Sequence, residues 1–276
     1  MIRRLFVLTG YFLRNIFFSL AGSIYIILAL AYWAIFFPPG QGTPDLDNYF
    51  LIIGAFGAAM TFLATLTIAA RAYRAENYPL VVRLPSRAEY ITAVFTSALL
   101  FTFVLQLLIA VLALIRGPQL SLGKMLEIPP LWISINLLAA MLALHASDMV
   151  ASGWSRVVIF GVLAILLIGQ NLVERFTSGL SAAVSSLSSV FYAQQWVTIA
   201  DAFGRLSAWL YGVGSETLGK VLGVVFWPFN AITDAVLAGY FTPTQALAPA
   251  ILVLYATILF LIASDLFATK DLDMSE

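Results

Sequence analysis

The sequence predicts an all-α membrane protein, and two observations support this prediction: its apolar composition and the long gaps between its charged residues. Of the 276 residues, 62% are hydrophobic and 10% are charged, whereas soluble domains hold about 45–50% and about 25%. The mean hydropathy is +0.97. Because a soluble core cannot bury this much apolar surface, the chain belongs in a bilayer.

Six charge-free stretches locate the predicted membrane spans. A helix needs about 20 apolar residues to cross about 30 Å of hydrocarbon with its backbone groups paired. Trimmed at proline and glycine, the expected spans are residues 16–37, 49–70, 91–115, 130–147, 157–173 and 246–265. The first span ends at Pro38-Pro39-Gly40, and the fourth begins at Pro129-Pro130.

The remaining segments complete a single transmembrane domain over residues 1–276. Before the first span we expect an N-terminal interfacial helix, with Ile2, Leu5, Leu8 and Phe12 on its apolar face and Arg3, Arg4 and Arg14 among the headgroups. The long connection 174–245 contains serine-rich residues 176–200 and an apolar stretch, 218–240, broken by proline. We expect interfacial or re-entrant helices at the outer face there, with two further spans as the alternative.

The distribution of lysine and arginine predicts the orientation of the spans. The short outer loops, 38–48 and 116–129, contain only Arg116 and Lys124. The opposite side contains nine basic residues: Arg3, Arg4, Arg14, Arg71, Arg74, Arg83, Arg87, Arg156 and Lys270. Since basic residues accumulate on the cytoplasmic side, we expect both termini in the cytoplasm, in the inner membrane of a bacterium.

Composition excludes several classes of function. Fourteen basic residues balance fourteen acidic ones, so no net positive charge attracts nucleic acid. The absence of cysteine excludes disulfides and thiolate metal sites, and the single His145 excludes any site with two imidazoles. A membrane-embedded enzyme is disfavoured because the sequence has no H-E-x-x-H motif and no paired intramembrane carboxylates.

Two motifs resemble functional ones. Residues 214–220 have the G-x-x-x-x-G-K spacing of a phosphate-binding loop, but Val221 stands where Ser or Thr would hold Mg²⁺, so we interpret the match as chance. His145 and Asp148 could form a proton relay; we expect them instead to lie solvated near the headgroups. No catalytic or metal-ligating residue is assigned, no cofactor is expected in this chain, and the substrate-binding residues stay open.

The connection between the second and third spans, residues 71–90, is the most informative segment. Its charged residues occur before Pro79, between Pro79 and Pro85, and after Pro85. A new helix is expected to begin at Ser86, and Glu89 follows three residues later. This spacing predicts a capping box, in which the Ser86 hydroxyl accepts from the Glu89 amide and the Glu89 side chain reaches back to the Ser86 amide. The segment is thus predicted to be a structured element at the cytoplasmic face.

The same residues resemble a known element. Arg74-Ala75-Glu76, followed by the run from Leu80 to Glu89 with its Pro85-Ser86-Arg87 turn, is similar to the cytoplasmic stretch of permease subunits in type 2 ABC exporters. This resemblance implies a permease that a separate ATPase subunit energises by docking on residues 71–90. The implied docking residues are Arg74, Glu76, Arg83, Pro85, Ser86, Arg87 and Glu89.

The resemblance also implies partners. Two permeases would pair as a homodimer or as a heterodimer with a similar chain, and the ABC ATPase would hold ATP and Mg²⁺. The charge-poor spans favour lipid-like or hydrophobic cargo. The alternative is a non-transporting structural subunit of a larger integral-membrane complex.

Overall fold

The computed structural model describes residues 2–38, 46–114, 122–150, 157, 161, 172–238 and 241–270. These residues contain helices and no strand, which confirms the all-α class. Contacts divide the chain into two compact units, where the sequence predicts one domain. The first unit comprises Met1–Ile159 with Ala231–Glu276, and the second comprises Phe160–Asn230.

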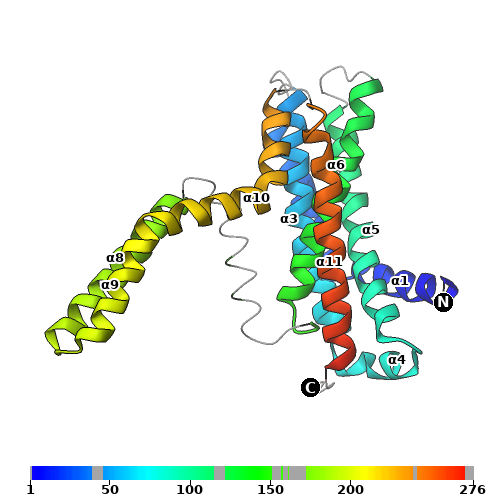
Figure 1. The fold of residues 1–276 in the computed structure, drawn as a ribbon. Coiled ribbons are helices and arrows are strands. Elements are labelled where there is room, and N and C mark those ends of the chain that lie inside the picture. The colour runs from blue at the N-terminus through cyan, green and yellow to red at the C-terminus, as the bar shows by residue number, and fades with distance from the viewer. Residues whose placement is uncertain are drawn as a thin grey trace. The chain divides into compact units, whose positions relative to one another are not determined.

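The first unit is built around long helices that run alongside one another. Helices α3, α5, α6 and α11 form the bundle, and α1 lies across it near one end (Figure 1). The bounds of its helices are α1 Ile2–Phe17, α2 Leu20–Phe36, α3 Leu46–Ala72, η1 Ala75–Asn77, α4 Tyr78–Arg83, α5 Arg87–Leu114, α6 Leu122–Ala146, η2 Gln245–Leu247 and α11 Ala248–Thr269.

Four segments in the described residues are long and apolar enough to cross a membrane: Tyr49–Ala72, Arg87–Leu114, Pro129–Ala146 and Gln245–Thr269. They correspond to the predicted spans 49–70, 91–115, 130–147 and 246–265, so the protein is a multi-pass membrane protein. A fifth candidate is the pair α1 and α2, which meets the same test only when the two helices are taken together. The predicted span 157–173 lies almost entirely outside the described residues.

The prediction that the first span begins at residue 16 is wrong, because the chain bends by 69° between α1 and α2. The Ser19 hydroxyl caps α2 by accepting from the Gly22 amide at 3.2 Å. A Cβ at Gly22 would lie 2.0 Å from the Ile16 carbonyl oxygen, so only glycine allows this close approach. The bend therefore depends on two local residues.

Helix α1 buries the expected apolar face except at its first residue. Leu8 and Phe12 are buried as predicted, but Ile2 is 71% exposed and Ile16 is buried in its place. The buried face packs on α5, and the Ser97 hydroxyl of α5 donates to the Thr9 carbonyl at 3.2 Å. The contact with α5 therefore sets which side of α1 is covered.

Helix α6 begins at Leu122, so Pro129 and Pro130 lie inside it and do not begin it as predicted. A proline leaves a carbonyl of the preceding turn without its amide partner. Membrane helices tolerate this because neighbouring groups can satisfy that carbonyl. The two prolines are therefore not a start signal.

Buried polar side chains join the helices of the bundle. On α5, the Gln106 amide nitrogen donates to the Ile53 carbonyl of α3 at 3.1 Å, and its oxygen accepts from Asn136 of α6 at 2.7 Å. A Cβ at Gly57 would lie 2.2 Å from the Gln106 nitrogen. Gly57 thus makes room for the side chain, as close packing at small residues predicts.

The second unit is centred on a helical hairpin. Helices α8 (Leu172–Ala193) and α9 (Val197–Tyr211) pack together, and α10 (Val213–Ala238) follows and continues into residues of the first unit. Ser181 and Ser207 each donate to the other's carbonyl at 3.0 Å across the hairpin. Among the described residues, none of these three helices meets both the length and the hydropathy needed for a candidate span.

Candidate functional site

The 71–90 connection folds back against the end of α3. The Tyr90 hydroxyl donates to the Ala72 carbonyl at 2.7 Å, and the Asn77 side chain donates to the Arg71 carbonyl at 2.9 Å. Tyr11 of α1 donates to the Asn77 side-chain oxygen at 3.3 Å. The last carbonyls of α3, which have no amide partner within the helix, thus accept hydrogen bonds from side chains. These bonds fix the start of the 71–90 connection.

The apolar run after Pro79 forms the short helix α4. Proline is accommodated in its first turn, where an amide hydrogen is not needed. Val81 points inward and is buried, whereas Tyr78 and Val82 are 46% and 60% exposed. Leu84 is extended, with ψ 139°, as a residue before proline prefers. Helix α4 is therefore anchored by one side chain and presents the others outward.

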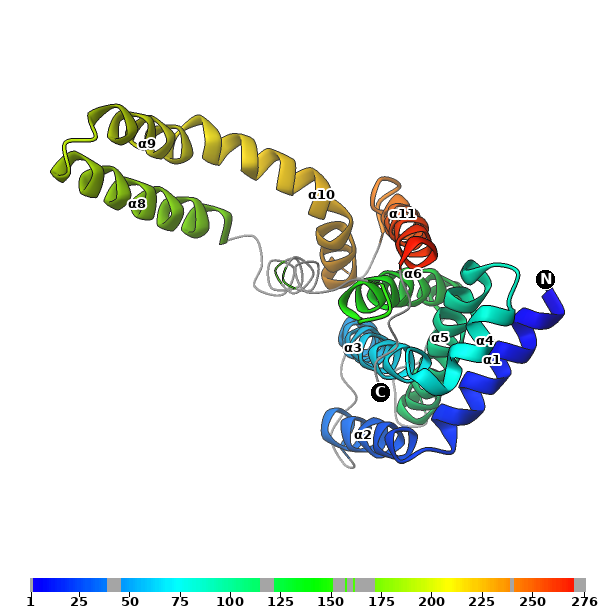
Figure 2. The same ribbon diagram turned by 90° about the horizontal axis from the view of Figure 1, so that it is seen from below.

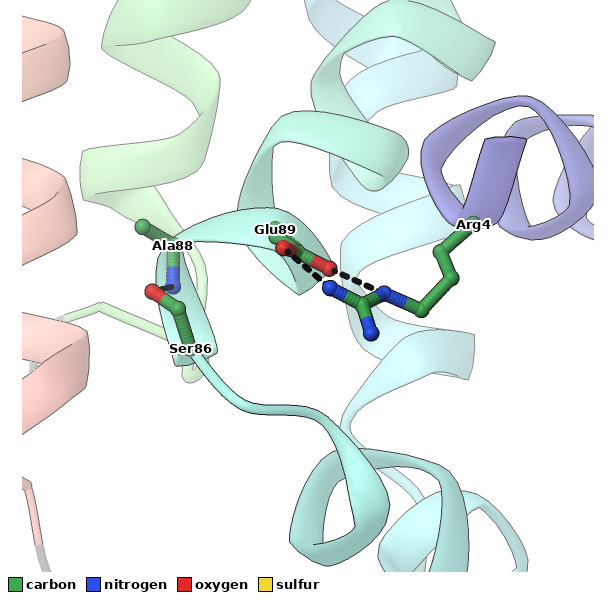
Figure 3. Close-up of polar contacts among 4 residues, drawn as sticks. All are labelled: Arg4, Ser86, Ala88 and Glu89. Carbon is green, nitrogen blue, oxygen red and sulfur yellow. Dashed lines mark hydrogen bonds and ion pairs between the residues drawn. The ribbon is translucent and has the colours of Figure 1, made fainter. Parts of the chain in front are cut away.

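Ser86 caps α5, but neither bond of the predicted capping box forms. The Ser86 hydroxyl accepts from the Ala88 amide at 3.2 Å and not from the Glu89 amide (Figure 3). The Glu89 side chain turns toward α1, where Arg4 donates to its Oε1 at 3.3 Å. Glu89 Oε2 lies 3.3 Å from Arg4 Nε, as an ion pair that lacks hydrogen-bond geometry. A guanidinium offers the buried carboxylate a stronger partner than a backbone amide does.

Arg87 holds the end of α11. Its Nη1 donates to the carbonyls of Lys270 at 2.7 Å, Ala268 at 3.2 Å and Phe267 at 3.4 Å. The Lys270 ammonium lies 4.8 Å from the centre of the Tyr73 ring. A cation at a helix C-terminus satisfies open carbonyls and complements the helix dipole. The end of α11 therefore lies on the same side of the bundle as residues 71–90.

The structure divides the seven predicted docking residues into two groups. In Figure 2, which looks along the bundle, α1, α4 and α5 gather on one side of the unit. Arg87 and Glu89 are engaged within the chain, and Glu89 is buried. The exposed group is Arg74, Glu76, Arg83, Pro85 and Ser86. Docking of an ATPase stays a prediction, and the exposed group is where it can occur.

Sequence reasoning missed two kinds of residue at this site. Tyr78 and Val82 lie four residues apart on α4, so they share one exposed face. Their signal was the apolar run after Pro79, read as a helical turn. Arg4 had no comparable signal, because its partner Glu89 is 85 residues away.

The His145/Asp148 pair and residues 214–220 differ in geometry from a proton relay and a phosphate-binding loop. His145 is buried, and its Nε2 lies 2.8 Å from the Leu259 carbonyl of α11, so the expectation that it is solvated is wrong. Asp148 is exposed, as expected.

Residues 214–220 lie inside helix α10, where Lys220 pairs with Glu216 at 2.6 Å. A phosphate-binding loop precedes its helix, whereas these residues are themselves helical.

Compared with protein-family models, curated proteins and solved structures, the chain matches none of them. The function proposed below therefore depends on the geometry of this site and on the resemblance of its sequence.

Replacing Arg87 with alanine should loosen the end of α11, because three carbonyls lose their donor. We expect faster hydrogen exchange in residues 264–270 and a loss of about 1 kcal/mol of stability in detergent. The matched control is Arg83→Ala, since the Arg83 side chain is exposed and contacts no polar group within the described residues. Equal exchange in the two variants would contradict the capping assignment.

Proposed function

We propose that this chain is the membrane-spanning permease subunit of an ATP-driven, ABC-type exporter. The observation that supports it best is the placement of α4. This helix joins two spans, α3 and α5, and exposes Tyr78, Val82 and Arg83 together. An exposed apolar face rimmed by charge is typical of a protein interface. An ATPase subunit that holds ATP and Mg²⁺ is the partner that the resemblance implies.

The contacts around α4 give a route for force into the spans. Val81 anchors α4 against the unit, Tyr90 ties the start of α5 to the end of α3, and Arg87 ties α5 to α11. Displacement of α4 would thus be transmitted to three spans together. A change between inward- and outward-open states requires that the ATPase contact the two states with different free energy.

The proposal includes six spans with both termini in the cytoplasm of a bacterial inner membrane. Supporting it, the end of α11 and residues 71–90 lie on one side of the bundle, and the basic residues of α1 are on that side too. Residues 157–173 would supply the fifth span. Two such subunits would pair, and the exposed apolar side chains of α11, such as Leu254 and Leu261, leave room for lipid or a second permease.

Cysteine labelling tests the orientation, since the chain has no cysteine of its own. Thr244→Cys lies before α11 and Ala75→Cys lies in η1, both at exposed positions. In intact cells, an impermeant maleimide should label position 244 and leave position 75 unlabelled until the membrane is opened. The reverse pattern would invert the proposed topology and place α4 outside the reach of any ATPase.

Loss of ATPase capture tests the docking. The variant Val82→Ala/Arg83→Ala removes exposed atoms of α4 and leaves Val81, Arg87 and Glu89 in place. Truncating interface residues costs about 1–3 kcal/mol, which is roughly 5- to 150-fold in affinity. We therefore expect much less ATPase to copurify with this variant.

The control for that experiment is Arg14→Ala, an exposed arginine on α1. Capture of an ATPase at wild-type stoichiometry by the α4 variant would contradict docking on this helix. Capture of a pigment-carrying or redox complex in place of an ATPase would favour the alternative, a non-transporting structural subunit.

A further inference from the structure

A cavity lies between α1 and the end of α3, beside the proposed docking helix. Its volume is about 200 Å³. Its apolar lining residues are Phe12, Ile16 and Ile68. Its polar lining residues come from two separate segments of the chain, α1 at Tyr11 and Asn15 and the stretch from Arg71 to Asn77. The cavity is therefore amphipathic.

The charges that line this cavity are two cations and one anion: Arg71, Arg74 and Glu76. Arg71 is held in place, because its Nη1 donates to the Asn15 carbonyl at 3.3 Å. Arg74 and Glu76 are exposed, and neither side chain has a hydrogen bond or ion pair in the part of the chain that the structure describes. The Arg74 guanidinium and the Glu76 carboxylate can therefore both contact a ligand in this cavity.

The depth of the cavity indicates the kind of ligand. The apolar stretch of α3 ends at Ala72, so Arg71 and Arg74 lie where hydrocarbon gives way to headgroups. Guanidinium groups match phosphate oxygens in geometry and charge. A carboxylate in the same cavity disfavours a purely anionic ligand and accepts hydrogen bonds from an ammonium group.

We propose that this cavity binds the headgroup of a zwitterionic phospholipid with a primary ammonium group, phosphoethanolamine in chemical class. Its phosphate would lie between Arg71 and Arg74, and its ammonium group would donate to Glu76. Binding would tie a lipid to α1 and to the end of α3 at once. The site is a property of this chain by itself and does not depend on an ATPase or on transport.

Native mass spectrometry of the purified full chain in detergent tests this proposal with three probes of matched acyl chains: phosphatidylethanolamine, phosphatidylcholine and phosphatidylglycerol. Phosphatidylethanolamine should be retained best, because the trimethylammonium group of phosphatidylcholine has no hydrogen to donate to Glu76. Arg74→Gln should weaken retention of phosphatidylethanolamine and phosphatidylglycerol about tenfold, as one charge-assisted contact predicts. Glu76→Gln should weaken phosphatidylethanolamine and strengthen phosphatidylglycerol.

The matched control is Arg83→Gln, an exposed arginine of α4 that does not line the cavity; it should retain lipid as the wild-type chain does. Equal retention of phosphatidylethanolamine and phosphatidylcholine, or an Arg74→Gln variant that binds as well as wild type, would overturn the proposal. Displacement of the lipid by an equal concentration of soluble phosphoethanolamine would overturn the lipid assignment. Because no ATPase is present, these outcomes are independent of the docking experiment.

Discussion

The open carbonyls at helix ends are the constraint on which the first unit depends. A helix leaves its last carbonyls without amide partners, so those that the fold covers need donors from elsewhere in the protein. Here the donors come from other helices: Arg71 serves the end of α1, Tyr90 serves the end of α3, and Arg87 serves the end of α11. Each bond completes one helix and positions another. The 71–90 connection is therefore an ordered segment between two spans. A few of its side chains, such as Val82, are exposed and could contact a partner.

Deeper in the bundle, side chains also contact carbonyls that lie within helices and not at their ends. Tyr49 donates to the Ala110 carbonyl at 3.0 Å, Gln106 to Ile53 at 3.1 Å, and His145 Nε2 lies 2.8 Å from Leu259. Polar contacts between membrane helices average about 0.6 kcal/mol each, so none of them alone holds the bundle. Together these contacts fix how α3, α5, α6 and α11 pack against one another. Force applied at α4 would therefore move a packed group of helices, as the proposed exporter function requires.

Four of the six predicted spans match candidate spans of the structure. They could be predicted because a charge inside hydrocarbon is costly, so gaps between charges mark the bilayer. The capping partner of Ser86 was mispredicted because the local rule ignores distant competitors. Arg4 lies 85 residues from Glu89 and takes its carboxylate, and the carbonyls that Arg87 serves are about 180 residues away. The bend before α2 had local signals in Ser19 and Gly22, which the hydrophobic pattern obscured. Contacts across the bundle could not be predicted from spacing along the chain.

Site-specific photocrosslinking in living cells tests the central claim most directly, namely that the ordered 71–90 connection presents α4 to a cytoplasmic ATPase. A photoreactive residue replaces Val82, and the control carries it at Phe18, which is 87% exposed but lies at the bend between α1 and α2. The account predicts an adduct between position 82 and an ATP-binding subunit, with none from position 18. An adduct from position 82 only to a protein that binds no nucleotide, or no adduct at all, would contradict the account.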